Sequence, residues 1–390
     1  MNNDNDIVTQ GQDAVFPAQE LNARVDAARE ELVRRGIDVY IVTGPENIFY
    51  LTGQQTPGYY TFQALLLPAE GEPWFVVRGL EYANLIANSW INQVERYPDS
   101  ADPVEVVSSL IKRLGWSARR IAIDKRGWFL PIALYESLSD ALGEVSDAAG
   151  VIEFLRRVKS PLELDKIAQA AAYTDAGMTA GLEAVRAGAT DNDLVAAMMQ
   201  ASIAQGGEYV GMEPLVTVGK RTGVPHGTWR RGRLGDNAPA FLEMSGCHDR
   251  YHASLMRCAW VGQPPDEARR MMDACLEGLE AALSQLKPGN TCAQVHDACQ
   301  AVIDKAGYTE AFRKRVGYSI GISFAPDWGE GQILSLYTGV DVELAEGMAF
   351  HVVPALRDYG EFTVCVSETA VVTENGHKTL GTVPRAMHVV

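Results

Sequence analysis

The sequence lacks long apolar runs, and its surplus of charge is acidic. Among 390 residues, Lys and Arg number 34 against 50 Asp and Glu, a formal net charge of −16. Phosphate binding needs clustered basic side chains, so this balance disfavours nucleic-acid partners, and it disfavours anionic membrane surfaces for the same reason. No stretch is apolar over the length that crosses a bilayer. The composition, 47% hydrophobic, is typical of a globular chain that buries a sizeable core.

Cysteine is also sparse, and it forms no paired motif. No CxxC pair occurs, and the six cysteines lie in the second half, at positions 247, 258, 275, 292, 299 and 365. This pattern is typical of buried free thiols in a reducing compartment and not of a disulfide framework. The opening MNNDNDIVTQGQDAVF has neither the basic nor the apolar region of a secretory signal. We therefore expect a cytoplasmic protein.

Strand and helix patterns alternate through the first part of the chain. Apolar residues recur at helical spacing from Leu21 to Val33, and Gly36 ends that helix. Four short apolar strands follow, in DVYIVTG, FQALLLP, EPWFVVRG and RRIAIDK, separated by helical patterns. This alternation predicts an α/β domain over residues 1–156.

The sequence pattern changes at Ser160, where a long helix is expected to begin. Ser160 is a plausible N-cap, Pro161 suits the first helical position, and Glu163 completes a capping box. Further on, two strands flank the turn CHDR, two helices are separated by Pro288-Gly289, and the last segments read as strands. Residues 157–390 therefore read as an α+β domain, with helices on one face of a mostly antiparallel sheet.

Six motifs in a fixed order carry a family resemblance. They are VPHGT, AFLEMSGCHDRYHASLMRCAWVG, LKPGNTCAQV, GYSIG, LAEGMAFHVVP and SETAVVTENG. In this order they resemble the pita-bread fold of the prolidase, methionine aminopeptidase and creatinase superfamily. The earlier GPENIFYLTG is similar to the signature of the creatinase-type amino-terminal domain. The resemblance implies a two-domain hydrolase that acts on a small molecule as a homodimer.

The peptidases of this superfamily hold two metal ions with two Asp, one His and two Glu. Carried over by motif, these ligand positions fall on Glu243, Ser254, Tyr318, Val353 and Ser367, the last followed by Glu368. A dinuclear centre needs several converging carboxylate or imidazole donors, and most of them are missing here. We therefore expect no metal and no other cofactor. Either the chain is a non-catalytic binding module, or protein groups alone perform the hydrolysis.

Within the superfamily, the metal-free ectoine hydrolases resemble this sequence most. GYSIG, PDWGE, FLEMSG, YHASLMR and the SET before VVTENG carry that likeness, and creatinase is a second metal-free relative. The implied activity is metal-independent opening of a cyclic amidine. A creatinase-like amidinohydrolase, an Xaa-Pro peptidase homologue with atypical ligands and a small-molecule binder remain alternatives. The loop QQTPGYYTFQ departs from the ectoine hydrolases, so the substrate stays open.

Hydrolysis of an amidine or amide needs a nucleophile, a proton donor for the leaving nitrogen and stabilisation of the intermediate. Glu243 is the candidate nucleophile, or the base that activates water. His226, between Pro and Gly in a loop, is the candidate general acid or base, because its ordinary pKa lies near neutrality. Tyr318 is a candidate donor to an oxyanion. His252, preferred to its neighbour Tyr251, and Glu368 complete the predicted catalytic set.

Candidate substrate contacts come from both domains. Arg230 stands for a loop with three arginines, one of which is expected to bind a carboxylate. Trp328 offers a wall for a cationic ring, with core packing as the alternative. Tyr60 and Phe62 either reach across a dimer interface or form the core of a hairpin. Ser254 faces the same site, whereas His248 and His351 are expected to be structural.

Overall fold

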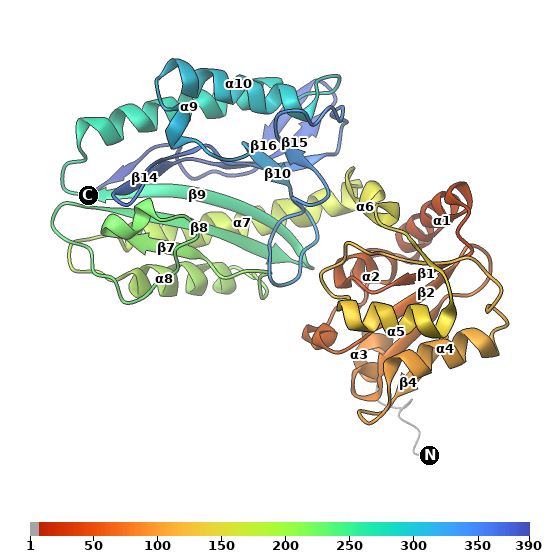
Figure 1. The fold of residues 1–390 in the computed structure, drawn as a ribbon. Helices are drawn as coiled ribbons and strands as arrows, with labels where there is room; N and C mark the ends of the chain where they lie inside the picture. Colours follow the sequence, from red (N-terminus) through yellow and green to blue (C-terminus); the bar gives the residue numbers. More distant parts are fainter. Residues whose placement is uncertain (1–7) are drawn as a thin grey trace. The chain divides into compact units, whose positions relative to one another are not determined.

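The computed structural model describes residues 8–390, and the chain divides into two compact units, Met1–Arg156 and Arg157–Val390 (Figure 1). All six cysteines are buried free thiols, as expected. Within residues 8–390, no helix combines the length and apolar character that a membrane span requires.

The first unit contains a six-stranded mixed sheet in the order β4-β3-β2-β1-β5-β6. Its strands are β1 (Val39–Val42), β2 (Ala64–Pro68), β3 (Trp74–Arg78), β4 (Val94–Tyr97), β5 (Ile121–Ile123) and β6 (Val145–Asp147). Its helices are α1 (Ala18–Arg35), α2 (Pro45–Thr52), α3 (Tyr82–Asn88), α4 (Pro103–Arg113), α5 (Ile132–Leu142) and α6 (Val151–Arg156), with 3-10 helices η2 (Pro57–Tyr60) and η3 (Gly79–Glu81). The sequence-based α/β prediction for this unit is confirmed.

Helix α1 buries most of the predicted apolar face and ends where the sequence suggests. Gly36 adopts a left-handed conformation, φ 69°, and its N–H caps the carbonyls of Leu32 and Val33. Val33 itself is 65% exposed, so its assignment to the core face is wrong. It follows buried Leu32 directly, and the 100° step between helical residues turns it away from the sheet.

The aromatic segment after α2 is not a hairpin. Residues Pro57–Tyr60 form η2, capped by the Thr56 side chain. Tyr60 is 77% exposed, whereas Phe62 packs partly against the first unit's core, and its carbonyl accepts a hydrogen bond from the Tyr97 hydroxyl. The hairpin-core interpretation is therefore wrong for Tyr60, and its proposed reach to a partner stays a prediction.

The second unit contains two larger sheets, ordered β17-β9-β8-β7 and β11-β10-β12-β15-β16, and the pair β13-β14. Its helices are α7 (Pro161–Glu183), α8 (Asp191–Ala204), α9 (Asp266–Gln285) and α10 (Cys292–Lys305), with 3-10 helices η4 (Gly219–Gly223) and η5 (Thr309–Ala311). Its strands are β7 (Leu215–Val218), β8 (Ala238–His248), β9 (Tyr251–Val261), β10 (Gly317–Ser319), β11 (Ser335–Leu336), β12 (Ala349–Val352), β13 (Ala355–Asp358), β14 (Phe362–Cys365), β15 (Glu368–Thr373), β16 (Gly376–Thr379) and β17 (His388–Val389).

Each larger sheet of this unit carries its helices on one face, as expected: α7 and α8 cover the sheet of β8 and β9, and α9 and α10 cover the strands of the other sheet. Figure 1 shows α7 and α8 on one side of the strands and α9 and α10 on the other. The side chains of β8 and β9 alternate between two cores. Leu242 and Leu255 belong to the core with α7 and α8, whereas Phe241 and Met256 belong to the core with α9 and α10.

A tight turn fixes the register of β8 and β9. Asp249 and Arg250 both have positive φ, 47° and 65°, as the mirror-image two-residue hairpin turn requires. The resulting register pairs Glu243 with Met256 and Ser245 with Ser254. Since directly paired residues lie on the same face, Glu243 and Ser254 share the face that looks away from α7 and α8.

A buried ion pair fastens β10 and its following loop to the start of α7. The predicted capping box of Ser160 and Glu163 is present, and Lys159 directly precedes it. Lys159 Nζ lies 2.8 Å from Glu330 Oε2 and 3.1 Å from Ser319 Oγ, and both charged side chains are 1% exposed. The other Glu330 oxygen accepts the Ile322 N–H at 3.2 Å. This contact holds the segment that carries Tyr318 and Trp328.

We expect Lys159→Met to destabilise the protein by about 3–5 kcal/mol, because it removes the buried cation that contacts the Glu330 carboxylate. Urea unfolding followed by circular dichroism measures this. The double variant with Glu330→Gln should recover part of the loss, since it removes the buried negative charge. A loss below about 1 kcal/mol for Lys159→Met would mean that the pair contributes little.

Candidate active site

Glu243 lies in β8, on the strand face that looks away from α7 and α8. It remains partly exposed, yet surrounding protein removes most of its water, and this desolvation raises its pKa. Positive charge from Lys314 and then Arg357 acts in the opposite direction, and Asp327 adds to the rise. Within residues 8–390, the Glu243 carboxylate forms no hydrogen bond or ion pair. It is therefore free to meet a solute.

Lys314 and Arg357 are the cations whose charges lower the pKa of Glu243, and sequence reasoning missed both. Desolvation lowers the pKa of Lys314 to about 8, Arg357 lowers it further, and Glu243 opposes that shift. Arg357, on β13, has a buried Nε atom without a hydrogen-bond partner in the described chain. The arginine inside the apolar strand ALRD was the available signal for Arg357. Lys314 stands between Arg313 and Arg315, and nothing in RKR distinguishes it.

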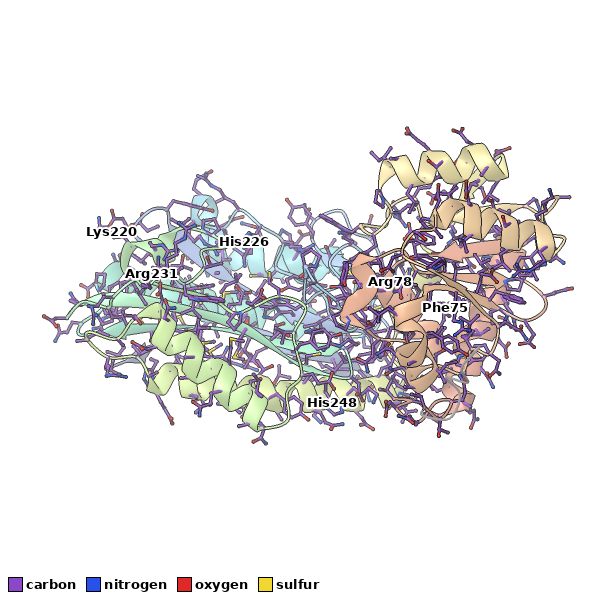
Figure 2. All side chains as sticks on the ribbon, turned by 90° about the horizontal axis from the view of Figure 1, so that it is seen from below. Phe75, Arg78, Lys220, His226, Arg231 and His248 are labelled. Carbon is purple, nitrogen blue, oxygen red and sulfur yellow. The ribbon has the colours of Figure 1, made fainter. Side chains whose placement is uncertain are left out.

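His226 responds to the same charges as Glu243. It follows η4 in a loop, is exposed, and has a positive φ of 53°. Protein around the ring lowers its pKa by desolvation; Arg357 and Lys314 lower it further, while Asp327 raises it. Figure 2 shows His226 well apart from His248 within the second unit. His226 and Glu243 therefore lie within electrostatic range of the same three charged residues, Lys314, Arg357 and Asp327.

Tyr318 is held by a chain of hydrogen bonds. The Trp328 Nε1–H donates to the Tyr318 hydroxyl at 3.0 Å, and this hydroxyl lies 2.9 Å from His351 Nδ1. His351 Nε2 lies 2.7 Å from Ser367 Oγ, which accepts the Met256 N–H at 2.7 Å. Burial and then the charge of Glu243 raise the pKa of Tyr318, so the phenol keeps its proton.

This chain corrects two expectations. Trp328 is 2% exposed and belongs to the core, so it positions Tyr318 and does not form an open wall for a substrate. His351 was expected to be only structural, but it contacts the candidate oxyanion donor. Desolvation, together with Lys314 and Arg257, lowers the pKa of His351 well below its ordinary value, so the ring is neutral.

His252 does not join this group, and its predicted acid–base role is wrong. Its ring is fully buried, Nδ1 donates to the Arg250 carbonyl at 3.0 Å, and Nε2 accepts the Gly211 N–H at 3.0 Å. Desolvation and then Arg250 lower its pKa to about 3, so it stays neutral. Its neighbour Tyr251 is equally buried and donates to Glu163 at 2.8 Å. Both strand faces are packed here, so alternation could not identify a catalytic face.

Glu368 is committed elsewhere. Its Oε1 accepts from Arg257 Nη2 at 2.8 Å and from Arg385 Nε at 3.1 Å, and the residue is 1% exposed. Desolvation raises its pKa, and both arginines oppose that shift. This arrangement makes Glu368 part of a buried ion-pair network, in place of the predicted catalytic role. Ser254, by contrast, has a buried Oγ without a partner in the described residues and shares the sheet face of Glu243.

The arginine loop is held by its backbone. Buried Asp191 accepts the N–H groups of Arg230 and Gly232 at 3.0 and 2.9 Å, together with Arg221 Nη1 at 3.3 Å. The Arg230 side chain is exposed, and it does not act on the pKa of Glu243. The guanidinium that acts on the candidate nucleophile is that of Arg357, and the role of Arg230 as a substrate contact stays a prediction.

The donor set does not fit the two-metal centre that the sequence resemblance raises. In the described part of the chain, no three His, Cys, Asp or Glu side chains come together as metal ligands. At the carried-over positions, Val353 is apolar, and Tyr318 and Ser367 are hydrogen bonded to His351. Glu243 is the one carboxylate among these positions, and a centre with two metal ions needs several such donors.

Known proteins share both the sequence and the fold of this chain. A protein of Halomonas elongata named ectoine hydrolase is 31% identical over 397 aligned residues, covering 96% of this chain and 98% of that one. An Xaa-Pro dipeptidase of Lactobacillus helveticus is 28% identical and covers 91% and 95%. The crystal structure of dipeptidase PepE from Mycobacterium ulcerans superposes with a TM-score of 0.82 at 26% identity, covering 96% and 99%.

Two family models account for most of the chain. The creatinase/prolidase N-terminal domain matches residues 24–158, and metallopeptidase family M24 matches residues 165–374. The pita-bread fold expected for the second unit agrees with these matches. The chain therefore belongs to metallopeptidase family M24 and carries a creatinase-type amino-terminal domain ahead of its pita-bread domain.

Proposed function

We propose that this hydrolase opens a C–N bond in a small zwitterionic amidine, with Glu243 as nucleophile or as base for water. One observation carries the proposal: an unpaired carboxylate of raised pKa lies within electrostatic range of two cations, Lys314 and Arg357, that likewise make no ion pair within residues 8–390. Keeping opposite charges apart in a desolvated site is unfavourable unless a ligand comes between them. A ligand with a cationic and an anionic end fits that space.

The chemistry follows from the positions of the charges. An amidinium near Glu243 would lower the pKa of that carboxyl group and favour the ionised form that attacks the amidine carbon or deprotonates water. Hydrolysis adds the oxygen of water to the carbon and its protons to the nitrogen as the C–N bond breaks. His226, whose lowered pKa keeps it neutral at pH 7, accepts a proton from water and returns it to the leaving nitrogen. Tyr318 stabilises negative charge that develops on oxygen.

The cations define the other end of the substrate. A guanidinium and an ammonium together bind a carboxylate, and Arg357 and Lys314 take this role in the proposal. Ectoine, a cyclic amidine with a carboxylate, has this charge pattern, and the relative with 31% identity bears the name ectoine hydrolase. Creatine also joins a guanidinium to a carboxylate, so a creatinase-like reaction is the second candidate. We propose that neither reaction requires metal.

We expect Glu243→Gln to reduce turnover of ectoine at least about 1,000-fold while the variant still binds the substrate, because the amide keeps the shape but loses the nucleophile. Product formation is followed by NMR with chelator present, and binding by calorimetry. Glu374→Gln, at an exposed position in the turn after β15, serves as the matched control.

The same panel contains creatine and Xaa-Pro dipeptides. Turnover of creatine alone would replace ectoine by the second candidate. Dipeptide cleavage that appears only after a divalent metal is added would contradict the proposal in favour of a peptidase. Binding without turnover on the whole panel would leave a small-molecule binder.

Lys314 should stabilise the bound substrate while it lowers the stability of the folded protein. Its folded pKa of about 8 lies below the ordinary 10.5, so between these values the unfolded chain holds a proton that the folded chain has released. Stability from this group therefore rises with pH through that window, and at pH 7 the buried ammonium is destabilising.

We expect Lys314→Met to raise the free energy of unfolding at pH 7 by about 1–3 kcal/mol, with a smaller gain near pH 10, and to raise KM for a carboxylate substrate. Urea unfolding at several pH values and steady-state kinetics measure the two effects. In the unchanged protein, KM should rise as pH passes about 8, because Lys314 loses its proton. A Lys314→Met variant with reduced stability and unchanged KM would contradict this role.

A further inference from the structure

We propose that Ser367 and His351 fix the direction of the Tyr318 hydroxyl proton, so that Tyr318 reaches the substrate as a hydrogen-bond donor. Tyr318 is then a catalytic residue of the proposed reaction, while Ser367 and His351 are positioning residues. The inference deepens the proposed function and rests on it for the identity of the acceptor. The direction of the hydrogen bonds is argued only from the contacts among Met256, Ser367, His351, Tyr318 and Trp328.

The donors at the two ends of this series of hydrogen bonds are fixed. The Met256 backbone N–H can only donate, and it donates to Ser367 Oγ at 2.7 Å. The Trp328 indole N–H can only donate, and it donates to the Tyr318 hydroxyl oxygen at 3.0 Å. Between them lies His351, 2.9 Å from the tyrosine oxygen and 2.7 Å from the serine oxygen. A neutral imidazole carries one N–H, so two arrangements are possible.

In the first arrangement, Ser367, His351 and Trp328 all have hydrogen-bond partners for their polar hydrogens. The Ser367 O–H donates to His351 Nε2, and the His351 Nδ1–H donates to the Tyr318 oxygen. That oxygen then accepts two hydrogen bonds, from His351 and Trp328, and its own hydrogen points elsewhere. Tyr318 is partly exposed, so this hydrogen can reach a solute.

In the second arrangement, the Tyr318 O–H donates to Nδ1, and the Nε2–H donates to Ser367 Oγ. Ser367 then accepts two hydrogen bonds, and its own hydrogen needs an acceptor. Ser367 is fully buried, and its Oγ has no third partner in the described part of the chain. A buried hydroxyl without an acceptor disfavours this arrangement by roughly tenfold or more in population.

The first arrangement therefore leaves the phenol hydrogen without a protein acceptor among residues 8–390, and the negative charge of Glu243 acts on Tyr318 more strongly than any other charge. A preoriented donor at that place stabilises an oxygen that becomes negative in the transition state. Trp328 and Gly329 lie against Tyr318 and leave the ring little freedom to turn away, since even a methyl group at Gly329 would lie 2.5 Å from it.

The decisive experiment is the tautomer of His351 in the full-length protein labelled with ¹⁵N-histidine. Seven histidines give the spectrum, and His351→Gln identifies the signal of interest by its loss. We expect a protonated Nδ1 and an unprotonated Nε2. Ser367→Ala removes the donor to Nε2 and should shift the population toward the Nε2–H form. Ser254→Ala removes an equally buried hydroxyl that has no hydrogen bond, and it should leave the tautomer unchanged.

Kinetics with ectoine test the consequence. We expect Tyr318→Phe to lower kcat about 100-fold or more, and Ser367→Ala about tenfold, with KM little changed in both. The double variant should be no slower than Tyr318→Phe alone, within about twofold, because Ser367 acts through the tyrosine proton.

The two proposals fail in different ways. An Nε2–H tautomer in the unchanged protein, or losses of kcat that multiply in the double variant, would overturn the inference about Ser367 and His351. Absence of hydrolysis across the substrate panel would overturn the proposed function. In that case the tautomer of His351 still decides whether the chain presents the Tyr318 proton.

Discussion

The site depends on a carboxylate that the fold surrounds with protein and leaves without a partner. Nearby buried acids are neutralised by direct contacts, Glu330 by Lys159 and Glu368 by Arg257. Glu243 has the charges of Lys314 and Arg357 within electrostatic range but touches neither in the described structure. Such separation is unfavourable in the empty protein, and a ligand with two opposite charges relieves it. The reactivity of Glu243 follows from this contrast with its paired neighbours.

The paired charges still matter to the site, because they fix the backbone that carries its neutral groups. Lys159 binds Ser319 and Glu330, and these two residues enclose the stretch from β10 to the loop that contains Trp328. Tyr318 directly precedes Ser319 in β10. Buried ionic contacts contribute little net stability in many proteins, but they specify one arrangement of the chain. Here the specified arrangement places the phenol beside His351 within hydrogen-bond distance.

Sequence reasoning reached the fold and selected Glu243 as a candidate, but it missed the charged groups that act on that residue. Alternation and the two-residue turn were enough to predict β8 and β9 and to place Glu243 on one face. The same rule failed at His252, because both faces of β9 are buried and a period of two cannot separate core from cavity. Lys314 was missed because its two neighbours are also basic, and only the fold decides which of the three points inward.

The replaced ligand positions argue against simple decay of an ancestral metal site. A site without a function would be expected to fill with groups that need no partner, yet Tyr318 and Ser367 are joined through His351 at 2.9 and 2.7 Å. Each of Tyr318, His351 and Ser367 is needed in this series of hydrogen bonds, because an apolar residue at any of the three positions leaves a buried donor or acceptor unsatisfied. Such a series of hydrogen bonds makes the protein less tolerant of substitutions at these positions. That lower tolerance is most easily understood if the tyrosine proton that the series orients takes part in a reaction at Glu243.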